Sequence, residues 1–381
     1  MTSYIPQYAL DRGRVDPAPT IDKTKGTPII NTQPENTPRS VLVAMSGGVD
    51  STVAAMLSIR DGLSCAGATM RLHTAESNGG GNDARTAAER LGIPYHVFDF
   101  TEPFTKHVLD RFTIAYLEGR TPNPCVDCNK RLKFGCFLEK ALELGYDFIA
   151  TGHFAQIGRG ADGRYLLKKG TDPEKDQSYV LYGLTQEQLA HVLFPIGGLT
   201  KQQVRELARA EGLGNADKRE SQDICFVPDG DYIGFIERRA GHPLRKGRFI
   251  DTEGNELGEN KGVAAYTIGQ RRGLGLAMPC PVYVLDIRPR DNTVVVGRGE
   301  LLYSTTLELR DINLIAADKL PSKIRANVKI RYKHQEQPAI VQQTGEDTLH
   351  VEFDKPQRAI TRGQAAVLYD GDTVLGGGTI V

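Results

Sequence analysis

Residues 40–155 alternate short apolar runs with longer segments in which apolar positions recur at helical spacing. The apolar runs predict strands, at 41–45, 65–72, 95–100 and 147–155. The longer segments predict helices, at 51–62, 82–92, 103–119 and 133–145. Strands separated by helices favour parallel pairing, so we predict an α/β domain built on a doubly wound parallel sheet. In such sheets, ligands bind beyond the carboxyl ends of the strands.

The pattern changes after about residue 223, where Gly and Pro become frequent and the apolar runs shorten. These runs predict strands, at 281–287, 292–297, 324–332, 349–354 and 365–371. Regular short strands with turn signals are typical of small β domains and barrels. We therefore expect a disordered extension, an α/β domain, a central β-rich domain and a C-terminal β-barrel, over residues 1–38, 39–222, 223–305 and 306–381.

Composition narrows the class of protein without identifying a partner. Of the 381 residues, 40% are apolar, and Lys plus Arg equal Asp plus Glu at 47 each, so net charge does not indicate a nucleic-acid partner. The six cysteines are too sparse for a disulfide scaffold, and no apolar run is long enough to cross a membrane. Residues 1–38 are rich in proline and lack the apolar core of a secretory signal. We expect a cytoplasmic protein.

A glycine-rich turn follows the first predicted strand, in "VLVAMSGGVDST" at 41–52. Successive glycines let backbone N–H groups converge on a phosphate, and the start of the next helix adds a favourable dipole. No Lys follows as in the ordinary P-loop. The turn resembles the PP-loop of the ATP-pyrophosphatase superfamily, which binds the pyrophosphate of ATP. A second glycine pattern, "GRGADG" at 158–163, is interpreted as a β-hairpin turn because "RYLLKK" follows it.

Two cysteines lie three positions apart in "TPNPCVDCNK" at 121–130. A zinc site needs four ligands, and no second C-x-x-C pair occurs at a short spacing. A thioredoxin-like site fits poorly with a phosphate loop upstream. A helix predicted to begin near Asn129 would favour the thiolate of Cys128, and Lys130 and Arg131 would add positive charge. We therefore predict that Cys128 is the reactive thiol, with Cys225 as its distant companion.

The segment "SKIRANVKIRYKH" at 322–334 alternates cationic and apolar positions. Its five cations fall on one face of a predicted strand, whereas Val328 and Ile330 fall on the other. A merely solvated strand face is the alternative. In a chain of zero net charge, this local concentration of cations favours contact with the phosphates of RNA.

Seven motifs, in order along residues 39–381, together resemble the tRNA-specific 2-thiouridylase family of bacteria and organelles. They are "MSGGVDST", "TPNPCVDCNK", "ATGHFA", "KDQSYVLY", "SQDICFVP", "YTIGQRRGLG" and "PQRAITRGQAAVLYDGD". The resemblance implies an enzyme that replaces the C2 oxygen of the wobble uridine by sulfur in tRNAs for Glu, Gln and Lys. ATP adenylates this oxygen, and a cysteine persulfide then supplies the sulfur.

The resemblance also implies roles for individual residues. Cys128 would be the nucleophile, Cys225 the persulfide carrier, and Asp50 a catalytic residue of the loop. ATP would contact Ala44, Met45, Ser46, Gly47, Gly48, Val49, Asp50, Ser51, Met70 and Gly152. The tRNA would contact Asn123, Pro124, Cys125, His153, Lys175, Asp176, Gln177, Arg331, Tyr332 and Gln364. The implied cofactors are ATP and Mg²⁺, and the implied partners are tRNA and a persulfide donor, either a cysteine desulfurase or a relay protein.

One position departs from the family pattern, because many members carry Asp where this chain has Cys125. The additional thiol makes a 4Fe-4S cluster held by Cys125, Cys128 and Cys225 an alternative to the persulfide cycle, which would pass through a Cys128–Cys225 disulfide. Two other classes stay open. One is a PP-loop ligase such as a synthetase of GMP, NAD or argininosuccinate, and the other is an iron-sulfur RNA-binding protein.

Overall fold

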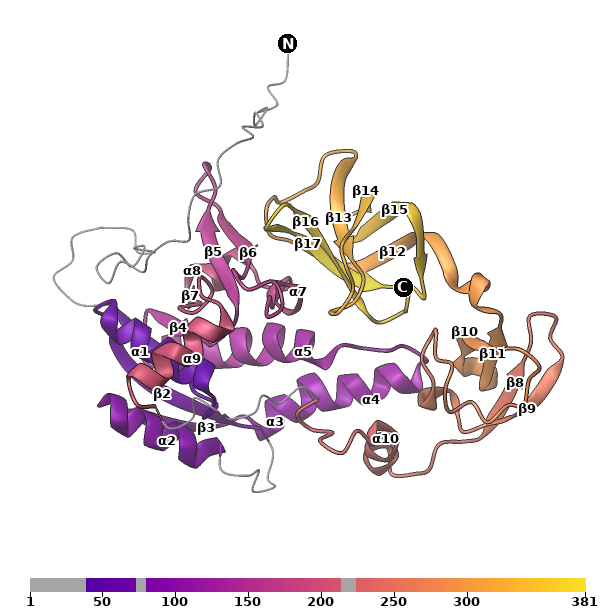
Figure 1. The fold of residues 1–381 in the computed structure, drawn as a ribbon, viewed down its shortest axis with the longest axis horizontal. Coiled ribbons are helices and arrows are strands. Elements are labelled where there is room, and N and C mark those ends of the chain that lie inside the picture. The colour runs from indigo at the N-terminus through magenta and orange to yellow at the C-terminus, as the bar shows by residue number, and fades with distance from the viewer. Residues whose placement is uncertain (1–38, 73–79, 214–223) are drawn as a thin grey trace, which may run out of the picture. The chain divides into compact units, whose positions relative to one another are not determined.

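The computed structural model describes residues 39–72, 80–213 and 224–381, drawn as ribbons in Figure 1. The predicted extension at 1–38 lies outside the described residues. In the part of the chain that the structure describes, no helix is long and apolar enough to cross a membrane.

A parallel sheet forms the first part of the fold, as predicted. Its strand order is β3-β2-β1-β4-β7, and every neighbouring pair is parallel. The strands are β1 (Ser40–Ala44), β2 (Ser64–Arg71), β3 (Tyr95–Asp99), β4 (Phe148–Ala150) and β7 (Val192–Leu193). The strand order reverses between β1 and β4, so the crevice beyond the carboxyl ends of these two strands is the expected ligand site.

Helices pack on this sheet in two cores. Val53 of α1 (Val49–Arg60) packs with Val204 of α9 (Lys201–Ala210) in one of them. In the larger core, Leu42 of β1 lies with residues of the helical segments between β3 and β4. The other helices of this region are α2 (Gly80–Leu91), α3 (Thr101–Phe104), η1 (Thr105–Leu109), α4 (Asp110–Leu117), α5 (Pro124–Asp127), η2 (Cys128–Cys136), α6 (Phe137–Glu143), α7 (Ser178–Leu181) and α8 (Gln186–Ala190).

The helix that carries the cysteine pair differs from the predicted one. It begins at Pro124 instead of near Asn129, because the Asn123 side chain caps it by accepting from the N–H of Cys125 at 3.1 Å. Its middle part, η2, is a π-helix, and the N–H of Phe137 bonds to the carbonyl of Leu132, five residues back. Such segments are rare and occur frequently at functional sites. Cys125 and Cys128 therefore occupy the first turns of one continuous helix.

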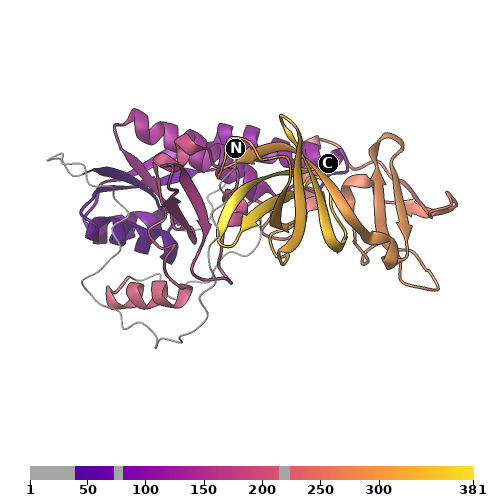
Figure 2. The same cartoon turned by 90° about the horizontal axis from the view of Figure 1, so that it is seen from above.

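The C-terminal region is a closed barrel, as predicted, because the edge strands β12 and β17 also pair with each other. Figure 2 shows its strands curving round toward one another. Valines and leucines at alternate positions fill its interior. The strands, in order round the ring, are β12 (Tyr303–Leu314), β15 (Thr348–Arg358), β14 (Gln337–Gly345), β13 (Ile324–Lys329), β16 (Ala365–Asp370) and β17 (Thr373–Ile380).

A hairpin from the α/β region (39–222) extends the barrel sheet. The sequence pattern did not predict this extension. β5 (Ala155–Arg159) and β6 (Tyr165–Lys169) pair antiparallel, so "GRGADG" is confirmed as a hairpin turn. β6 then pairs with β17 through Lys168 and Thr373. The α/β region and the barrel thus share one sheet.

The central region contains a four-stranded sheet of order β10-β11-β8-β9, as predicted for a small β-rich domain. The helix α10 (Tyr232–Ala240) precedes it and was not predicted. The strands are β8 (Gly247–Ile250), β9 (Glu256–Asn260), β10 (Tyr283–Arg288) and β11 (Thr293–Gly297), with short helical turns η3 (Val263–Ala265), η4 (Pro289–Asp291) and η5 (Gly299–Leu302).

Candidate active site

The predicted phosphate loop joins the end of β1 to the start of α1. Gly47 has a φ of 77°, a left-handed conformation that favours glycine. The N-cap residue of α1 is Gly48, so no side chain caps the first turn. The hydroxyl of Ser51 donates to the carbonyl of Gly48 at 3.0 Å and accepts from the N–H of Ser46 at 3.2 Å, which closes the loop. This loop therefore has the geometry of an anion site at a helix N-terminus.

Asp50, in the first turn of α1, is paired with a lysine that the sequence analysis missed. The ammonium of Lys201 lies 2.7 and 2.8 Å from the two carboxylate oxygens of Asp50. The Lys201 side chain is only 8% exposed and lies over the ring of Phe154. A buried ammonium beside a phosphate loop can neutralise charge on a bound polyphosphate.

Gly152 brings the end of β4 against the phosphate loop. A Cβ atom at this position would lie 2.7 Å from the carbonyl carbon of Asp50 and 2.7 Å from the nitrogen of Ser51, so only glycine fits. Ala44 and Met70, near the ends of β1 and β2, are partly buried against the larger core, and Met45 is buried. The predicted ATP residues thus gather at the reversal of strand order.

Cys225 follows the undescribed residues 214–223 and lies in the turn before α10. The next residue, Phe226, anchors this turn, because its ring packs against Phe104, Phe112 and Phe235 at centroid distances of 5.9, 5.2 and 5.1 Å. Phe226 packs on the same core as Cys128, and Cys125 and Cys128 both raise the pKa of Cys225, so Cys225 lies near the helix that carries them. All three are free thiols.

The electrostatics of the thiols differ from the prediction of a low pKa at Cys128. Desolvation by the surrounding protein is the largest effect on all three thiols, including Cys125 and Cys225 whose residues are partly open to solvent, and raises their pKa, for Cys225 to about 11. The proximity of the other thiols raises the pKa of Cys225 further, whereas the ammonium of Lys133 lowers the pKa of each thiol. The helix dipole prediction was wrong because Cys128 lies a turn inside the helix and is partly buried.

His153, predicted to contact tRNA, lies inside the protein. It is 6% exposed, and its ring packs against Phe134 and Phe194. Its Nδ1 lies 2.7 Å from the hydroxyl of Thr151, and its Nε2 lies 3.4 Å from the ammonium of Lys133. Burial holds the pKa of the ring well below its ordinary value, so the imidazole is neutral. Both ring nitrogens thus have partners within the protein.

Lys175, Asp176, Gln177 and Gln364, also predicted to contact tRNA, lie where the α/β region meets the barrel. The carboxylate of Asp176 accepts from the N–H groups of Gly170 and Ser178, at 3.1 and 3.0 Å, and Gln177 accepts from the N–H of Phe154 at 2.9 Å. Lys175 precedes them and is partly buried. The amide of Gln364, before β16, donates to the carbonyl of Thr121 at 2.7 Å.

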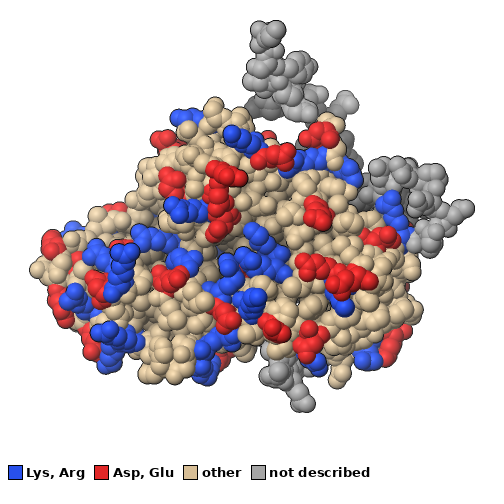
Figure 3. Space-filling view, turned by 180° about the vertical axis from the view of Figure 1, so that it is seen from behind, with Lys and Arg blue, Asp and Glu red and all other residues tan. Residues whose placement is uncertain are grey.

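The predicted basic strand is shorter than its pattern suggested. β13 ends at Lys329, so Arg331 and Tyr332 lie in the following turn. Acidic groups also approach the cations, because Arg325 pairs with Asp354 and the carboxylates of Asp176 and Glu336 act on Lys329. The ammonium of Lys329 lies 5.8 Å from the ring centre of Tyr332, and the Tyr332 hydroxyl is 3.5 Å from the carbonyl of Asp176. Figure 3 shows Lys and Arg gathered around a hollow on one face.

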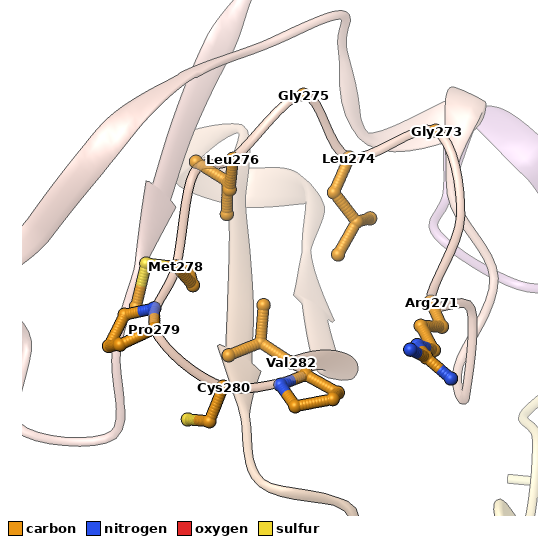
Figure 4. Close-up of a pocket in the computed structure, with 10 residues that line it drawn as sticks. Arg271, Gly273, Leu274, Gly275, Leu276, Met278, Pro279, Cys280 and Val282 are labelled. Carbon is orange, nitrogen blue, oxygen red and sulfur yellow. The ribbon is translucent and has the colours of Figure 1, made fainter.

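A shallow pocket in the central region is separate from these residues. Its lining comes from the segment between η3 and β10, including Leu274, Leu276, Met278 and Val282, with Arg271 at its edge (Figure 4). None of the predicted site residues lines it.

Three family models match the chain. They are the tRNA methyl transferase HUP domain over residues 39–229, the tRNA methyl transferase PRC-barrel domain over 234–298 and the aminomethyltransferase beta-barrel domain over 304–380. The tRNA-specific 2-thiouridylase of Carboxydothermus hydrogenoformans is 50% identical over 90% of this chain and 97% of that protein. The chain belongs to the tRNA-specific 2-thiouridylase family. Relatives of the same name from Clostridioides difficile and Caldanaerobacter subterraneus are 47% and 49% identical, over 90% and 89% of this chain and 98% and 97% of those proteins.

Membership of the 2-thiouridylase family confirms the resemblance inferred from the seven motifs, together with the fold class. Two of the matching family models are described as methyl transferase domains. The relatives that match about nine tenths of the chain are, however, named as thiouridylases. The domain boundaries at 222/223 and 305/306 stay predictions.

The iron-sulfur alternative requires three thiols that converge on one cluster. Among residues 39–72, 80–213 and 224–381, no group of three or more His, Cys, Asp or Glu side chains is placed to hold a metal ion. Cys125, Cys128 and Cys225 are neighbours, but as arranged they do not fit a cluster.

Proposed function

We propose that this 2-thiouridylase replaces the C2 oxygen of the wobble uridine by sulfur in tRNAs for Glu, Gln and Lys, using ATP and a cysteine persulfide. One observation carries the proposal. The segment 151–153 connects the phosphate loop with the thiols, because Gly152 packs on the backbone of Asp50 while the next residue, His153, contacts Lys133. Adenylation and sulfur transfer can therefore take place in one centre.

The phosphate loop supports the first half of the reaction. The N–H groups at the start of α1 would bind the pyrophosphate of ATP, and Lys201 would neutralise its charge. Asp50 would exchange its bond to Lys201 for Mg²⁺ as the lysine turns to the phosphates, and Mg²⁺ offsets negative charge on the phosphates when bound. These residues orient ATP so that the C2 oxygen of uridine attacks the α-phosphorus and pyrophosphate leaves, which makes this oxygen part of an AMP leaving group.

The thiols support the second half. Cys225, exposed in its turn, would receive sulfur from the donor protein as a persulfide. The terminal sulfur attacks C2 and AMP leaves, which links Cys225 to the uridine through an S–S bond. The thiolate of Cys128 then attacks the Cys225 sulfur, which forms the Cys128–Cys225 disulfide and releases 2-thiouridine. Two external thiol groups reduce the Cys128–Cys225 disulfide and are themselves oxidised to a disulfide, and a reducing cytoplasm would supply such thiols.

Mass spectrometry of tRNA nucleosides tests the function. The protein is incubated with unmodified tRNA, ATP, Mg²⁺ and a persulfide donor, and we expect 2-thiouridine together with AMP and pyrophosphate in equal amounts. Release of AMP without tRNA, or formation of a nucleotide in place of thiolated tRNA, would instead indicate another PP-loop ligase.

We predict that the Cys125→Ala variant thiolates tRNA without iron. In the persulfide cycle, only Cys128 and Cys225 exchange sulfur, so the variant and the parent, both purified anaerobically, should contain no stoichiometric iron and retain comparable turnover. Iron quantification and nucleoside analysis on the same samples check this. Iron-dependent activity that disappears in Cys125→Ala would establish the cluster mechanism in place of the persulfide cycle.

We propose that tRNA lies along the face that carries Lys329 and Arg331. Replacing both by Met should weaken tRNA binding. The slope of log K against log salt concentration should become less steep by about two, because each phosphate contact releases roughly one counterion. ATP binding should not change. A matched control that also removes two cations is the pair Arg60→Gln and Lys140→Met, on α1 and α6. A salt slope equal to that of the parent would exclude Lys329 and Arg331 from the RNA surface.

A further inference from the structure

Cys125, Cys128 and Lys133 lie on one helix, and its π segment sets the position of Lys133 relative to Cys128. Lys133 follows Cys128 by five residues within η2. In an α-helix of 3.6 residues per turn, five residues would rotate Lys133 about 140° away from Cys128. A π-helix closes its hydrogen bonds over five residues, so Lys133 lies one turn above Cys128 on nearly the same side.

Lys130 and Arg131, which the sequence predicted to act on Cys128, have other partners. The Nε of Arg131 bonds to the carboxylate of Asp127 at 3.3 Å, and Arg111 bonds to the same carboxylate at 3.0 Å. The stem of Lys130 packs over Gly183. Among the described residues, Lys133 is the one cation whose charge acts on Cys125, Cys128 and Cys225 together.

The ammonium of Lys133 is held by a buried histidine. Because an ammonium has only donors, Lys133 must donate to Nε2 of His153, which therefore carries no proton. The proton of the neutral ring is then on Nδ1, which donates to the hydroxyl of Thr151. Packing of the ring against Phe134 and Phe194 fixes its orientation. Thr151 follows β4 directly, so the sheet itself anchors this chain of hydrogen bonds.

We propose that Lys133 supplies the positive charge that stabilises thiolate and persulfide at the sulfur-transfer cysteines, and that His153 is the positioning residue that fixes its ammonium. This inference rests on the proposed sulfur transfer. Cys125 and Asp127 from α5 and Lys133 from η2 act on the charge of Cys128, and Cys128 in turn acts on Cys225 in the turn before α10. Cys125 and Asp127 disfavour a negative charge at Cys128, so the anion there depends on the ammonium of Lys133.

The test measures thiol reactivity and the two halves of the reaction in the same variants. In Lys133→Met, the pH profile of iodoacetamide alkylation at Cys128, followed by peptide mass spectrometry, should move to higher pH. Thiolation at pH 7 should fall about 10²-fold, because a preorganised charge is lost. AMP release with tRNA should stay at the parent rate. Lys133→Arg should recover most of the thiolation, and Lys140→Met, on the surface of α6, should match the parent.

Variants of His153 test the positioning role. His153→Leu removes the acceptor and should shift the alkylation profile in the same direction, whereas His153→Gln keeps an acceptor and should shift it less. The double variant Lys133→Met/His153→Leu should be no worse than Lys133→Met, because the histidine acts through the lysine.

The outcomes separate this inference from the proposed function. A parent enzyme that thiolates tRNA, with an alkylation profile at Cys128 that Lys133→Met leaves unchanged, would overturn the role of Lys133. Equal loss of AMP release and thiolation in a folded Lys133→Met variant would also overturn it, since the lysine would then act on the whole site. A parent that forms no 2-thiouridine would refute the proposed function itself.

Discussion

The Asp50→Asn variant should lose tRNA-dependent AMP formation by about 10²- to 10³-fold, because the loop no longer holds the metal and the pyrophosphate in place. The measurement is AMP release from labelled ATP with saturating tRNA. Asp61→Asn, at the other end of the same helix, is the matched control and should behave like the parent. AMP release at the parent rate in folded Asp50→Asn would remove Asp50 from the adenylation step.

The structure adds a second expected effect of this substitution. A neutral amide in place of the Asp50 carboxylate would leave the ammonium of Lys201 buried without its counter-charge, and breaking such a pair destabilises a protein by up to about 3 kcal/mol where one partner is partly exposed. The double variant Asp50→Asn/Lys201→Met should recover thermal stability while AMP formation stays lost. Recovery of stability without activity would separate the structural role of the pair from its role in catalysis.

The Cys128→Ser and Cys225→Ser variants should both lose multiple-turnover thiolation while they keep AMP formation, because adenylation uses the phosphate loop and not the thiols. They should fail at different points. Cys225→Ser accepts no sulfur from the donor. Cys128→Ser accepts sulfur and should accumulate an enzyme–tRNA disulfide adduct, which dithiothreitol cleaves to release 2-thiouridine.

Gel analysis of the adduct under non-reducing conditions, followed by nucleoside mass spectrometry after reduction, checks this difference. Cys280→Ser, an exposed cysteine of the central region, is the control and should turn over normally. Absence of the adduct with Cys128→Ser, although Cys225 carries persulfide, would contradict direct attack by the Cys225 persulfide. Full thiolation by Cys225→Ser would contradict the carrier role altogether.

Several features of the fold could be predicted because they depend on neighbours in the sequence. The apolar run 41–45 became β1, and the glycine turn after it became the start of α1, as local hydrophobic pattern and backbone freedom require. The hairpin at 158–163 was identified from its turn and from the strand that follows. The alternation in 324–330 correctly predicted which residues of β13 face the barrel interior.

Other features could not be predicted, because the residues that cause them lie far apart in the sequence. Nothing in the sequence near Lys201 indicates Asp50, 151 residues earlier, and only the packing of α9 on α1 brings them together. The shared sheet of β6 and β17 is likewise a long-range pairing. His153 was predicted to contact tRNA from its motif, yet the motif does not reveal that Phe134 and Phe194 enclose its ring.

The sequence by itself determined the order of the domains, the phosphate loop and the choice of Cys128 and Cys225 as the candidate exchanging pair, because each depends on a local pattern or a motif. Only the tertiary structure decided the electrostatics of the thiols. Burial raises their pKa, and the π segment places Lys133, rather than Lys130 or Arg131, where its charge reaches them. Solvation and charge act through space, so these effects depend on which distant residues surround a thiol and not on its neighbours in the chain.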